Sequence, residues 1–340
     1  MAPIAPRPQV ISVRPVTLPA PSRGQDLEVR ITAPTTGTDL PVIVFAHGFG
    51  QSMTGGDPLV DHWTANGFVV VQPTFLDAKS YGLTLDDPRY PTIWQTRVDD
   101  LERVLDDLDQ IIDAVPGLSG RVDTARIAAV GHSWGGQSVG MLLGARVLDA
   151  DGRPGEDRTD HRLRAGVLLS TTGIARGDLA PFAQEHFAFM SPDFSQLHTP
   201  SLVVAGDHDQ SQLSTRGPDW FTDVYHLSPG ARHLVTVHGG EHLLGGIQDY
   251  ESTATTDESP ERVDLVRHTT TAFLRTALGL DPDAWSAIAD AVGPATADAA
   301  GPAAAVGPAA AVGPAAAVGP ATAVGPAAAV GHIESKEYHS

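Results

Sequence analysis

The chain has 340 residues, of which 41% are hydrophobic, so it can bury a large core and is not disordered throughout. Its 22 Lys and Arg residues against 41 Asp and Glu residues give a net charge of −19, which disfavours nucleic acids and anionic membrane surfaces as partners. It has no cysteine, which excludes disulfides, thiolate metal sites and a cysteine nucleophile.

The N-terminal segment MAPIAPRPQVISVRP is interrupted by prolines and lacks the apolar core of a signal peptide. No apolar run approaches the length of a membrane span, so no membrane span is expected. As written, the sequence predicts a cytoplasmic protein, or a secreted one if a leader has been removed. The sequence leaves the oligomeric state open.

The body between roughly residues 10 and 280 begins with strand patterns. Two β-rich runs, Val10–Val16 and Leu27–Ala33, are separated by a Pro/Ser/Gly turn and predict an antiparallel hairpin. Short, nearly continuous apolar runs follow, which is typical of strands buried on both faces. These runs are Pro41–Ala46, Phe68–Gln72, Arg126–Val130, Ala165–Ser170, Ser201–Ala205 and His233–Val237.

Helical patterns lie between these runs. The clearest places apolar residues from Val98 to Val115 on one face, with Thr92 and Gln95 as a candidate capping box and Pro116-Gly117 as the end. Another helix is expected to begin at Ser259-Pro260 and to stop at Gly279. Alternating strands and helices predict an α/β fold, a mostly parallel central sheet with helices on both faces. Ligands in such sheets bind beyond the carboxyl ends of the strands.

The composition changes near Val292, and Gly301–Val330 repeats the hexapeptide GPAAAV with one Thr in place of Ala. Gly-Pro pairs interrupt helices, and small apolar residues cannot bury a core. We therefore expect a catalytic domain over residues 1–290 and a disordered low-complexity tail over 291–340; an elastin-like self-association segment is the alternative. Truncation after Asp290 is expected to leave the melting temperature nearly unchanged.

The segment Gly131–Gly136, GHSWGG, directly follows the strand run ending at Val130 and precedes a helical stretch. It contains G-x-S-x-G in a strand–turn–helix context, where the glycines permit a tight turn that presents a serine hydroxyl. The pattern alone is weak in a chain with 35 glycines, and an ordinary glycine-rich turn is the alternative. Its position favours Ser133 as a nucleophile.

A nucleophilic serine needs a base and an orienting carboxylate. Two strand runs end in segments that carry such groups: Gly206–Asp209 (GDHD) and His238–His242 (HGGEH). The chain order predicts Asp209 as the acid and His242 as the base; Asp207 is the alternative acid. His226, His233 and His238 are interpreted as surface or structural residues, and no metal is expected.

The chemistry also needs backbone amides that bind the oxyanion. The residue after the nucleophile, Trp134, supplies one. The loop His47–Gly50 (HGFG) follows the strand run Pro41–Ala46, and its small residues allow the Phe49 amide to face the site. A plain βα turn is the alternative interpretation of this loop.

Together these motifs resemble the α/β-hydrolases, in particular the branch of dienelactone hydrolases, chlorophyllases and bacterial cutinases (polyester hydrolases). Gly48-Phe49 is similar to that branch's oxyanion loop, Gly131–Gly136 to its elbow, Gly206–Asp209 to its acid segment and Gly239–His242 to its base segment. The resemblance implies the α/β-hydrolase fold and favours Asp209 over Asp207. Trp134 stands where cutinases usually carry methionine, and the absent cysteines exclude their C-terminal disulfide; both weaken the polyester interpretation.

The sequence therefore predicts a serine carboxylic-ester hydrolase that needs no cofactor and acts on small to medium apolar or aromatic esters, with polymeric esters as a further candidate. Phe49 and Trp134 are expected to line the substrate pocket, with Trp94 and Phe75 as further candidates. The loops Asp149–Arg162 and Gly173–His198 are expected to border it. The alternatives are an acyltransferase or perhydrolase with the same triad, and a catalytically inactive binding protein on the same fold.

Overall fold

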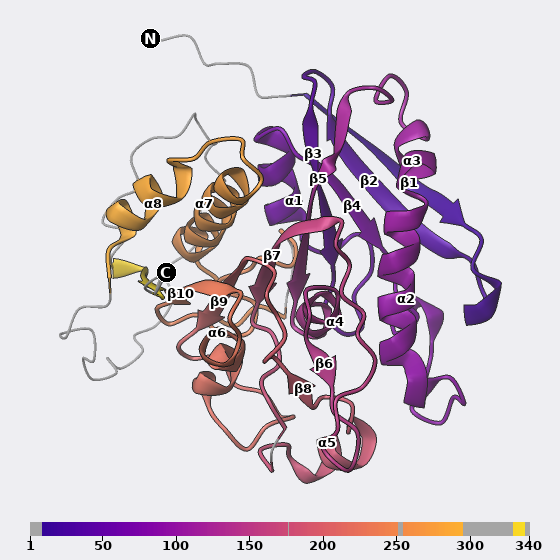
Figure 1. Ribbon diagram of the computed structural model, residues 1–340, viewed down its shortest axis with the longest axis vertical. Coiled ribbons are helices and arrows are strands. Elements are labelled where there is room, and N and C mark those ends of the chain that lie inside the picture. The colour runs from indigo at the N-terminus through magenta and orange to yellow at the C-terminus, as the bar shows by residue number, and fades with distance from the viewer. Residues whose placement is uncertain (1–8, 176, 251–253, 295–328, 337–340) are drawn as a thin grey trace, which may run out of the picture.

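The computed structural model describes residues 9–175, 177–250, 254–294 and 329–336 (Figure 1). Within these ranges the core is a nine-stranded sheet, and a short β6–β8 pair stands apart from it. In spatial order the sheet consists of β1 (Val10–Leu18), β2 (Leu27–Pro34), β4 (Val69–Pro73), β3 (Leu40–Ala46), β5 (Val122–His132), β7 (Leu163–Leu169), β9 (Ser201–Gly206), β10 (Ala231–Val237) and β11 (Gly331–Ser335); the pair is β6 (Arg146–Val147) and β8 (Pro192–Asp193).

The strand pairing confirms the predicted fold class. β1 and β2 form the antiparallel hairpin, with Val13 opposite Ile31. From β4 through β3, β5, β7 and β9 to β10, all neighbouring strands are parallel. All residues of β3, β4 and β9 are buried, as expected for strands covered on both faces. The carboxyl ends of these strands meet at one edge, where the motif-bearing loops begin.

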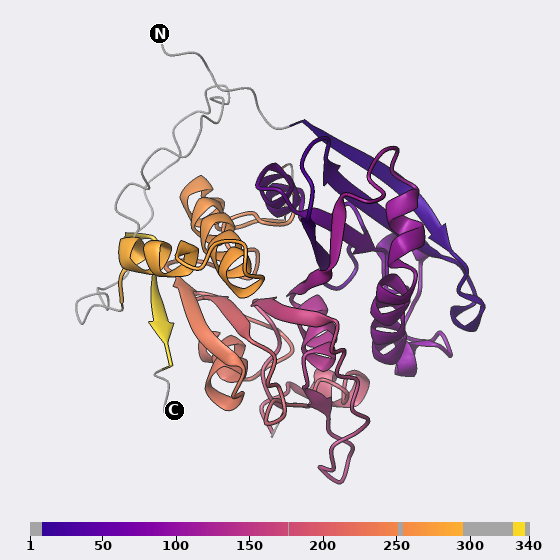
Figure 2. The same ribbon diagram turned by 45° about the horizontal axis from the view of Figure 1, so that its top comes forward.

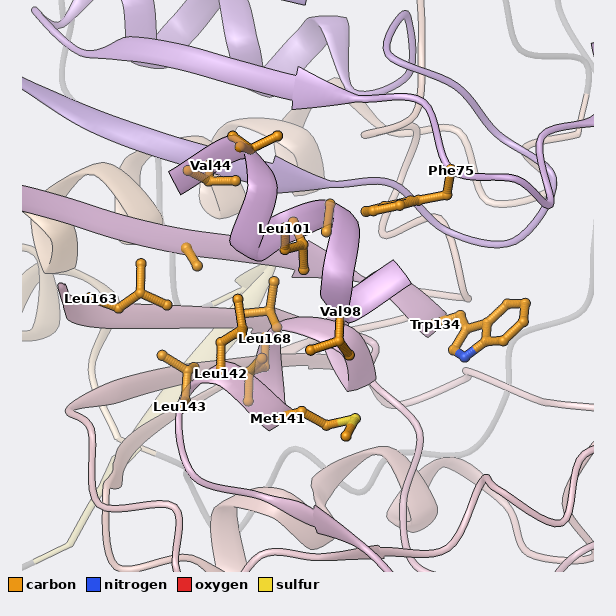
Figure 3. Packing of buried hydrophobic residues seen from close by; sticks show 14 of the residues in the cluster. Val44, Phe75, Val98, Leu101, Trp134, Met141, Leu142, Leu143, Leu163 and Leu168 are labelled. Atoms are coloured by element: carbon orange, nitrogen blue, oxygen red, sulfur yellow. The ribbon is translucent and has the colours of Figure 1, made fainter. Parts of the chain in front are cut away.

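Helices cover both faces of the sheet (Figure 2). One hydrophobic cluster packs α2, α3 and α4 against one face, and a second packs α1, α7 and α8 against the other. Figure 3 shows part of the first cluster, where Val98 and Leu101 of α2 lie beside Met141 and Leu142 of α4. The helices are α1 (Asp57–Ala65), α2 (Ile93–Asp106), α3 (Leu108–Asp113), α4 (Trp134–Leu142), α5 (Pro181–His186), α6 (Asp223–Leu227), α7 (Pro260–Ala277) and α8 (Ala284–Val292). None of the helices in the described ranges combines the length and apolarity that a membrane crossing requires.

The predicted helix that begins near Thr92 differs from the structure in two respects, whereas the predicted start of α7 matches it. The helix expected to run to Val115 is divided at Asp107 into α2 and α3; the two parts bury the same face, so periodicity alone reads them as one. Thr92 makes no capping hydrogen bond from its side chain, which instead donates to the Arg89 carbonyl. At α7 the prediction is confirmed: the Ser259 hydroxyl accepts from the Arg262 amide, with Pro260 in the first turn.

β11 is an element that the sequence analysis did not find. It pairs antiparallel with β10, from His233 opposite Ser335 to Val237 opposite Gly331, and Figure 2 shows the two strands side by side. Ile333 is buried against the second cluster, and its amide donates to the Gly293 carbonyl. A strand with one buried apolar residue carries almost no periodicity, which explains the miss.

Because β11 lies within the predicted tail, the structure changes the expectation for part of that tail. Residues 295–328, which hold most of the GPAAAV repeat, lie outside the described residues, so their disorder and the domain division at residue 290 stay predictions. The segment after them nevertheless contributes a strand to the central sheet. Truncation after Asp290 would remove that strand together with Val292, which is 1% exposed. We therefore no longer expect the melting temperature to stay unchanged.

Candidate active site

Ser133 lies in a tight turn between β5 and α4. Its backbone has φ +55° and ψ −122°, an uncommon conformation for a residue other than glycine. The flanking glycines have a steric reason: a Cβ at Gly131 would collide with the Gly135 backbone, and a Cβ at Gly135 would collide with the Ala46 carbonyl. The sequence thus forces the serine out of the sheet at the start of a helix.

The structure brings the three predicted triad residues together. The Ser133 Oγ lies 2.8 Å from His242 Nε2, and His242 Nδ1 lies 3.1 Å from each of the two carboxylate oxygens of Asp209. Asp209 is fully buried, whereas the His242 side chain is 37% exposed. The arrangement lets the imidazole accept the serine proton while the buried carboxylate holds its other nitrogen.

Asp207, the alternative acid, has a different partner. It is exposed and its Oδ1 accepts a 2.6 Å hydrogen bond from the Gly239 amide. This bond joins the loop after β9 to the loop after β10 that carries His242. Asp207 therefore braces the loop of the base and does not contact the imidazole.

The two predicted oxyanion donors lie close to the nucleophile. A Cβ at Gly48 would be 3.4 Å from the Ser133 Cβ, which shows how closely the loop approaches the elbow. Among the described residues, neither the Phe49 amide nor the Trp134 amide has a protein acceptor. The Phe49 ring is 53% exposed and stands 5.7 Å from the buried Trp134 ring. Both amides are therefore available to an oxygen at Ser133.

Two buried histidines flank this site, and sequence analysis gave neither a role. Burial and the Arg97 charge lower the pKa of His47 to about 4; burial, with a smaller effect of His242, lowers the pKa of His132 to about 3. Both are neutral near pH 7. The Nε2 of His132 donates to the His242 carbonyl over 2.8 Å and so supports the backbone of the base. The histidine before the serine in the motif was the signal for this contact.

A buried ion pair below the oxyanion loop was also missed. Arg97 and Asp77 are both completely buried, with 2.5 Å between Nη1 and Oδ1. Burial alone would raise the pKa of Asp77, but the Arg97 charge brings it below its ordinary value. Its signal in the sequence was an arginine at a core-facing position of α2, next to Val98 and one turn before Leu101.

The structure has a cavity of about 540 Å³, and its lining includes neither the triad residues nor Phe49 and Trp134, the two residues expected to line the substrate pocket. Its walls include Trp94 of α2, Met141 of α4 and Phe189. Phe189 stacks on Trp134 at 5.3 Å between ring centroids and on Trp94 at 6.1 Å. Both loops expected to border the site contribute to its walls, with Leu148, Asp149, Ala150, Gly155, Glu156 and Arg158 from or next to the first and Ala175, Leu179, Gln184, Ala188 and Ser191 from the second. Trp94 thus lines the cavity, whereas Phe75 is core.

In the described ranges, no three His, Asp or Glu side chains lie together as a metal site would require. His233 and His238, interpreted from the sequence as surface or structural residues, lie on or after β10 and contact β11: His233 bonds to Ser335 and His238 to His332.

Comparisons with known proteins agree with the motifs and the fold. The chlorophyllase family model matches residues 9–146, the range that holds the oxyanion loop and the elbow. No curated protein sequence matches the chain. Among solved structures, a ferulic acid esterase from Streptomyces cinnamoneus is similar, with a TM-score of 0.55 and 18% sequence identity over 81% of this chain and 91% of that chain. At this identity the likeness shows the fold alone. The comparisons bear out the predicted resemblance to esterases of this fold, with the family match confined to residues 9–146 and the structural likeness to the fold.

Proposed function

We propose that the chain is a serine carboxylic-ester hydrolase with Ser133 as nucleophile, His242 as base and Asp209 as orienting acid. The observation that carries the proposal is the continuous contact from the Ser133 Oγ through His242 to the buried Asp209 carboxylate. A general base within hydrogen-bond reach of a strained, presented hydroxyl is what acyl transfer through an acyl-enzyme needs.

The reaction follows from this geometry. His242 Nε2 takes the proton of Ser133 as its oxygen attacks the ester carbonyl carbon, and the amides of Phe49 and Trp134 stabilise the resulting oxyanion. The intermediate collapses when the alcohol leaves with the proton from His242. Water then attacks the acyl carbon while His242 takes its proton, and the acid is released when the bond to the Ser133 Oγ breaks and His242 returns that proton to the Oγ. No cofactor takes part in these steps.

The experiment that tests this proposal is covalent labelling with a fluorophosphonate, followed by peptide mapping. We expect one label per chain at Ser133, and we expect Ser133→Ala to lower kcat on p-nitrophenyl acetate by roughly 10⁶-fold, as removal of a triad serine does. Ser52→Ala is the matched control, a half-buried serine near the oxyanion loop, and should keep wild-type activity. Labelling at another residue, or turnover by the Ser133→Ala variant, would reject the assignment.

We further propose that the cavity lined by Trp94 and Phe189 receives an apolar or aromatic group of the ester. Its volume is in the range of small-molecule sites, and two aromatic side chains, Trp94 and Phe189, stand in its wall. The solved neighbour's name refers to an aromatic acid. Aromatic diesters and polyesters are candidate substrates on the same ground.

Filling the cavity tests this substrate preference. Leu148→Trp should lower kcat/KM for methyl ferulate or p-nitrophenyl octanoate by about tenfold or more, the scale of losing several buried CH₂ contacts, while leaving p-nitrophenyl acetate nearly unchanged. Leu227→Trp, at a 43% exposed position of α6, is the matched control. An unaltered substrate profile in Leu148→Trp would show that the cavity does not take the substrate.

Acyl transfer to another acceptor remains the second candidate, since the same triad serves acyltransferases and perhydrolases. The partition of products in added alcohol or peroxide separates the two, because hydrolysis gives the free acid even when the competing nucleophile is abundant. The third candidate, an inactive binding protein, predicts that the native chain neither takes the fluorophosphonate label nor turns over any ester.

A further inference from the structure

Arg97 is a fully buried cation with three hydrogen-bond partners, and none of them belongs to the triad. Its Nη1 lies 2.5 Å from Asp77 Oδ1, its Nη2 donates to the His47 carbonyl, and its Nε donates to the Ser138 hydroxyl over 3.1 Å. Burying a charge costs several kcal/mol unless it is fully paired. Such a group is retained where its fixed geometry has a use.

The first use lies in the oxyanion loop His47–Gly50. Arg97 binds the carbonyl at one end of this loop, and Asp77 Oδ2 accepts from the Gly50 amide at the other end over 3.0 Å. The Phe49 amide lies between these two attachments. The Phe75 amide donates to His47 Nε2 over 3.1 Å, so this nitrogen carries no proton and Nδ1 donates to the Gly48 carbonyl.

The second use lies at the nucleophile elbow. The Ser138 hydroxyl, which accepts from Arg97, donates to the Trp134 carbonyl over 3.1 Å. The guanidinium carbon lies 4.9 Å from the centroid of the Trp134 ring and 4.0 Å from that of Phe75; both rings stand at one end of the packed cluster in Figure 3. One guanidinium therefore touches the residue that supplies the second amide.

We propose that Arg97 and Asp77 are positioning residues that fix the spacing between the Phe49 and Trp134 amides. This inference rests on the proposed function, since it assigns those amides to oxyanion binding. The planar guanidinium has donors at fixed angles and can hold the loop and the elbow at once, which the single ammonium of a lysine cannot do. Donors must lie about 2.7–3.1 Å from the oxyanion, so a small shift of either amide lowers the rate.

The test compares an oxygen ester with its thionoester, p-nitrophenyl acetate with p-nitrophenyl thionoacetate. Sulfur is a weak hydrogen-bond acceptor, so the thionoester gains little from the two amides. We expect Arg97→Lys and Asp77→Asn to lower kcat for the oxygen ester by about 10- to 100-fold, up to the loss seen when one oxyanion donor is removed. For the thionoester, kcat should fall much less, and KM should change little for either substrate. The ratio of kcat for the oxygen ester to kcat for the thionoester therefore falls in these variants.

Arg30→Lys is the matched control, because Arg30 pairs with Asp57 and donates to the Ser12 hydroxyl, and neither partner belongs to the oxyanion loop or the elbow; its rate ratio should equal that of the wild type. If Arg97→Lys does not fold, Ser138→Ala removes only the hydroxyl between Arg97 and the Trp134 carbonyl, and a smaller fall in the ratio is expected. An equal loss of both substrates in Asp77→Asn and Ser138→Ala would overturn the inference. A wild-type chain that hydrolyses neither ester would instead overturn the proposed function.

Discussion

Asp209→Asn should lower kcat far more than Asp207→Asn, although these two aspartates lie only two residues apart in the loop after β9. Only Asp209 contacts the base: its two oxygens lie 3.1 Å from His242 Nδ1, and it is completely buried. Asp207 is exposed and accepts from the Gly239 amide. Each substitution replaces one carboxylate oxygen with an amide nitrogen and removes one negative charge, so the two variants form a matched pair.

The expected magnitude follows from the tautomer of His242. An asparagine amide group facing Nδ1 would donate to it and so place the imidazole proton on Nε2, which then cannot accept the proton of Ser133. Replacements of this kind lower kcat by about 10⁴-fold in serine triads, which corresponds to roughly 5 kcal/mol of activation free energy. An asparagine at 207 keeps the oxygen that accepts from Gly239, and an exposed charge contributes about 1 kcal/mol or less, so a loss below about fivefold is expected.

The assay is the steady-state kcat for p-nitrophenyl acetate, with the melting temperature of each variant measured in parallel. Asparagine matches aspartate in size, so both variants should remain folded and a lower rate can be assigned to chemistry. The reasoning would be refuted if Asp207→Asn had the larger effect, or if Asp209→Asn kept activity within about tenfold of the wild type, a difference of only about 1.4 kcal/mol.

Two further predictions concern stability. Truncation after Asp290 removes β11 with the buried Ile333, and burial of one such side chain contributes about 1.5–3 kcal/mol to stability. We therefore expect the truncated chain to melt several degrees lower, whereas a control truncated after Lys336 should melt as the full chain does. Equal melting temperatures for the two truncated chains would show that β11 does not stabilise the fold. Lowering the pH from about 6.5 toward 4 should lower the melting temperature, because the unfolded chain protonates His47 and His132 near pH 6.5 while burial holds their folded pKa values at about 4 and 3. Asp100 has the opposite effect: burial raises its folded pKa to about 7, so on acidification the folded chain binds this proton before the unfolded chain does and gains stability. Asp100→Asn should therefore make the melting temperature fall more steeply between about pH 6.5 and 4. A shallower fall would contradict the raised pKa of Asp100.

The elements and motifs that the sequence predicted depend on interactions within a few residues. β3, β4 and β9 are visible as apolar runs because every residue in them is buried, and α7 is visible from Ser259 and Pro260 because a cap acts on its own first turn. The elbow is visible because Gly131 is required by a contact with the Gly135 backbone four residues later, although Gly135 itself is required by a distant contact with the Ala46 carbonyl. These local constraints determined the fold class and placed the candidate nucleophile.

The tertiary structure decided what depends on contacts between distant segments. Asp207 and Asp209 are indistinguishable by residue type, and only the direction of the chain after β9 brings one of them to His242 and the other to Gly239. β11 owes its place to the free edge of β10, not to any periodicity of its own.

Arg97 is the clearest case of a role that only the tertiary structure reveals. In the sequence it interrupts the apolar face of a helix, and its partners stand 20 residues away at Asp77, 41 away at Ser138 and 50 away at His47. A charged residue at a core position indicates that partners must exist, because an unpaired buried charge is too costly. Which residues they are is set by the packing of α2 against α4 and the oxyanion loop, and no local pattern records it.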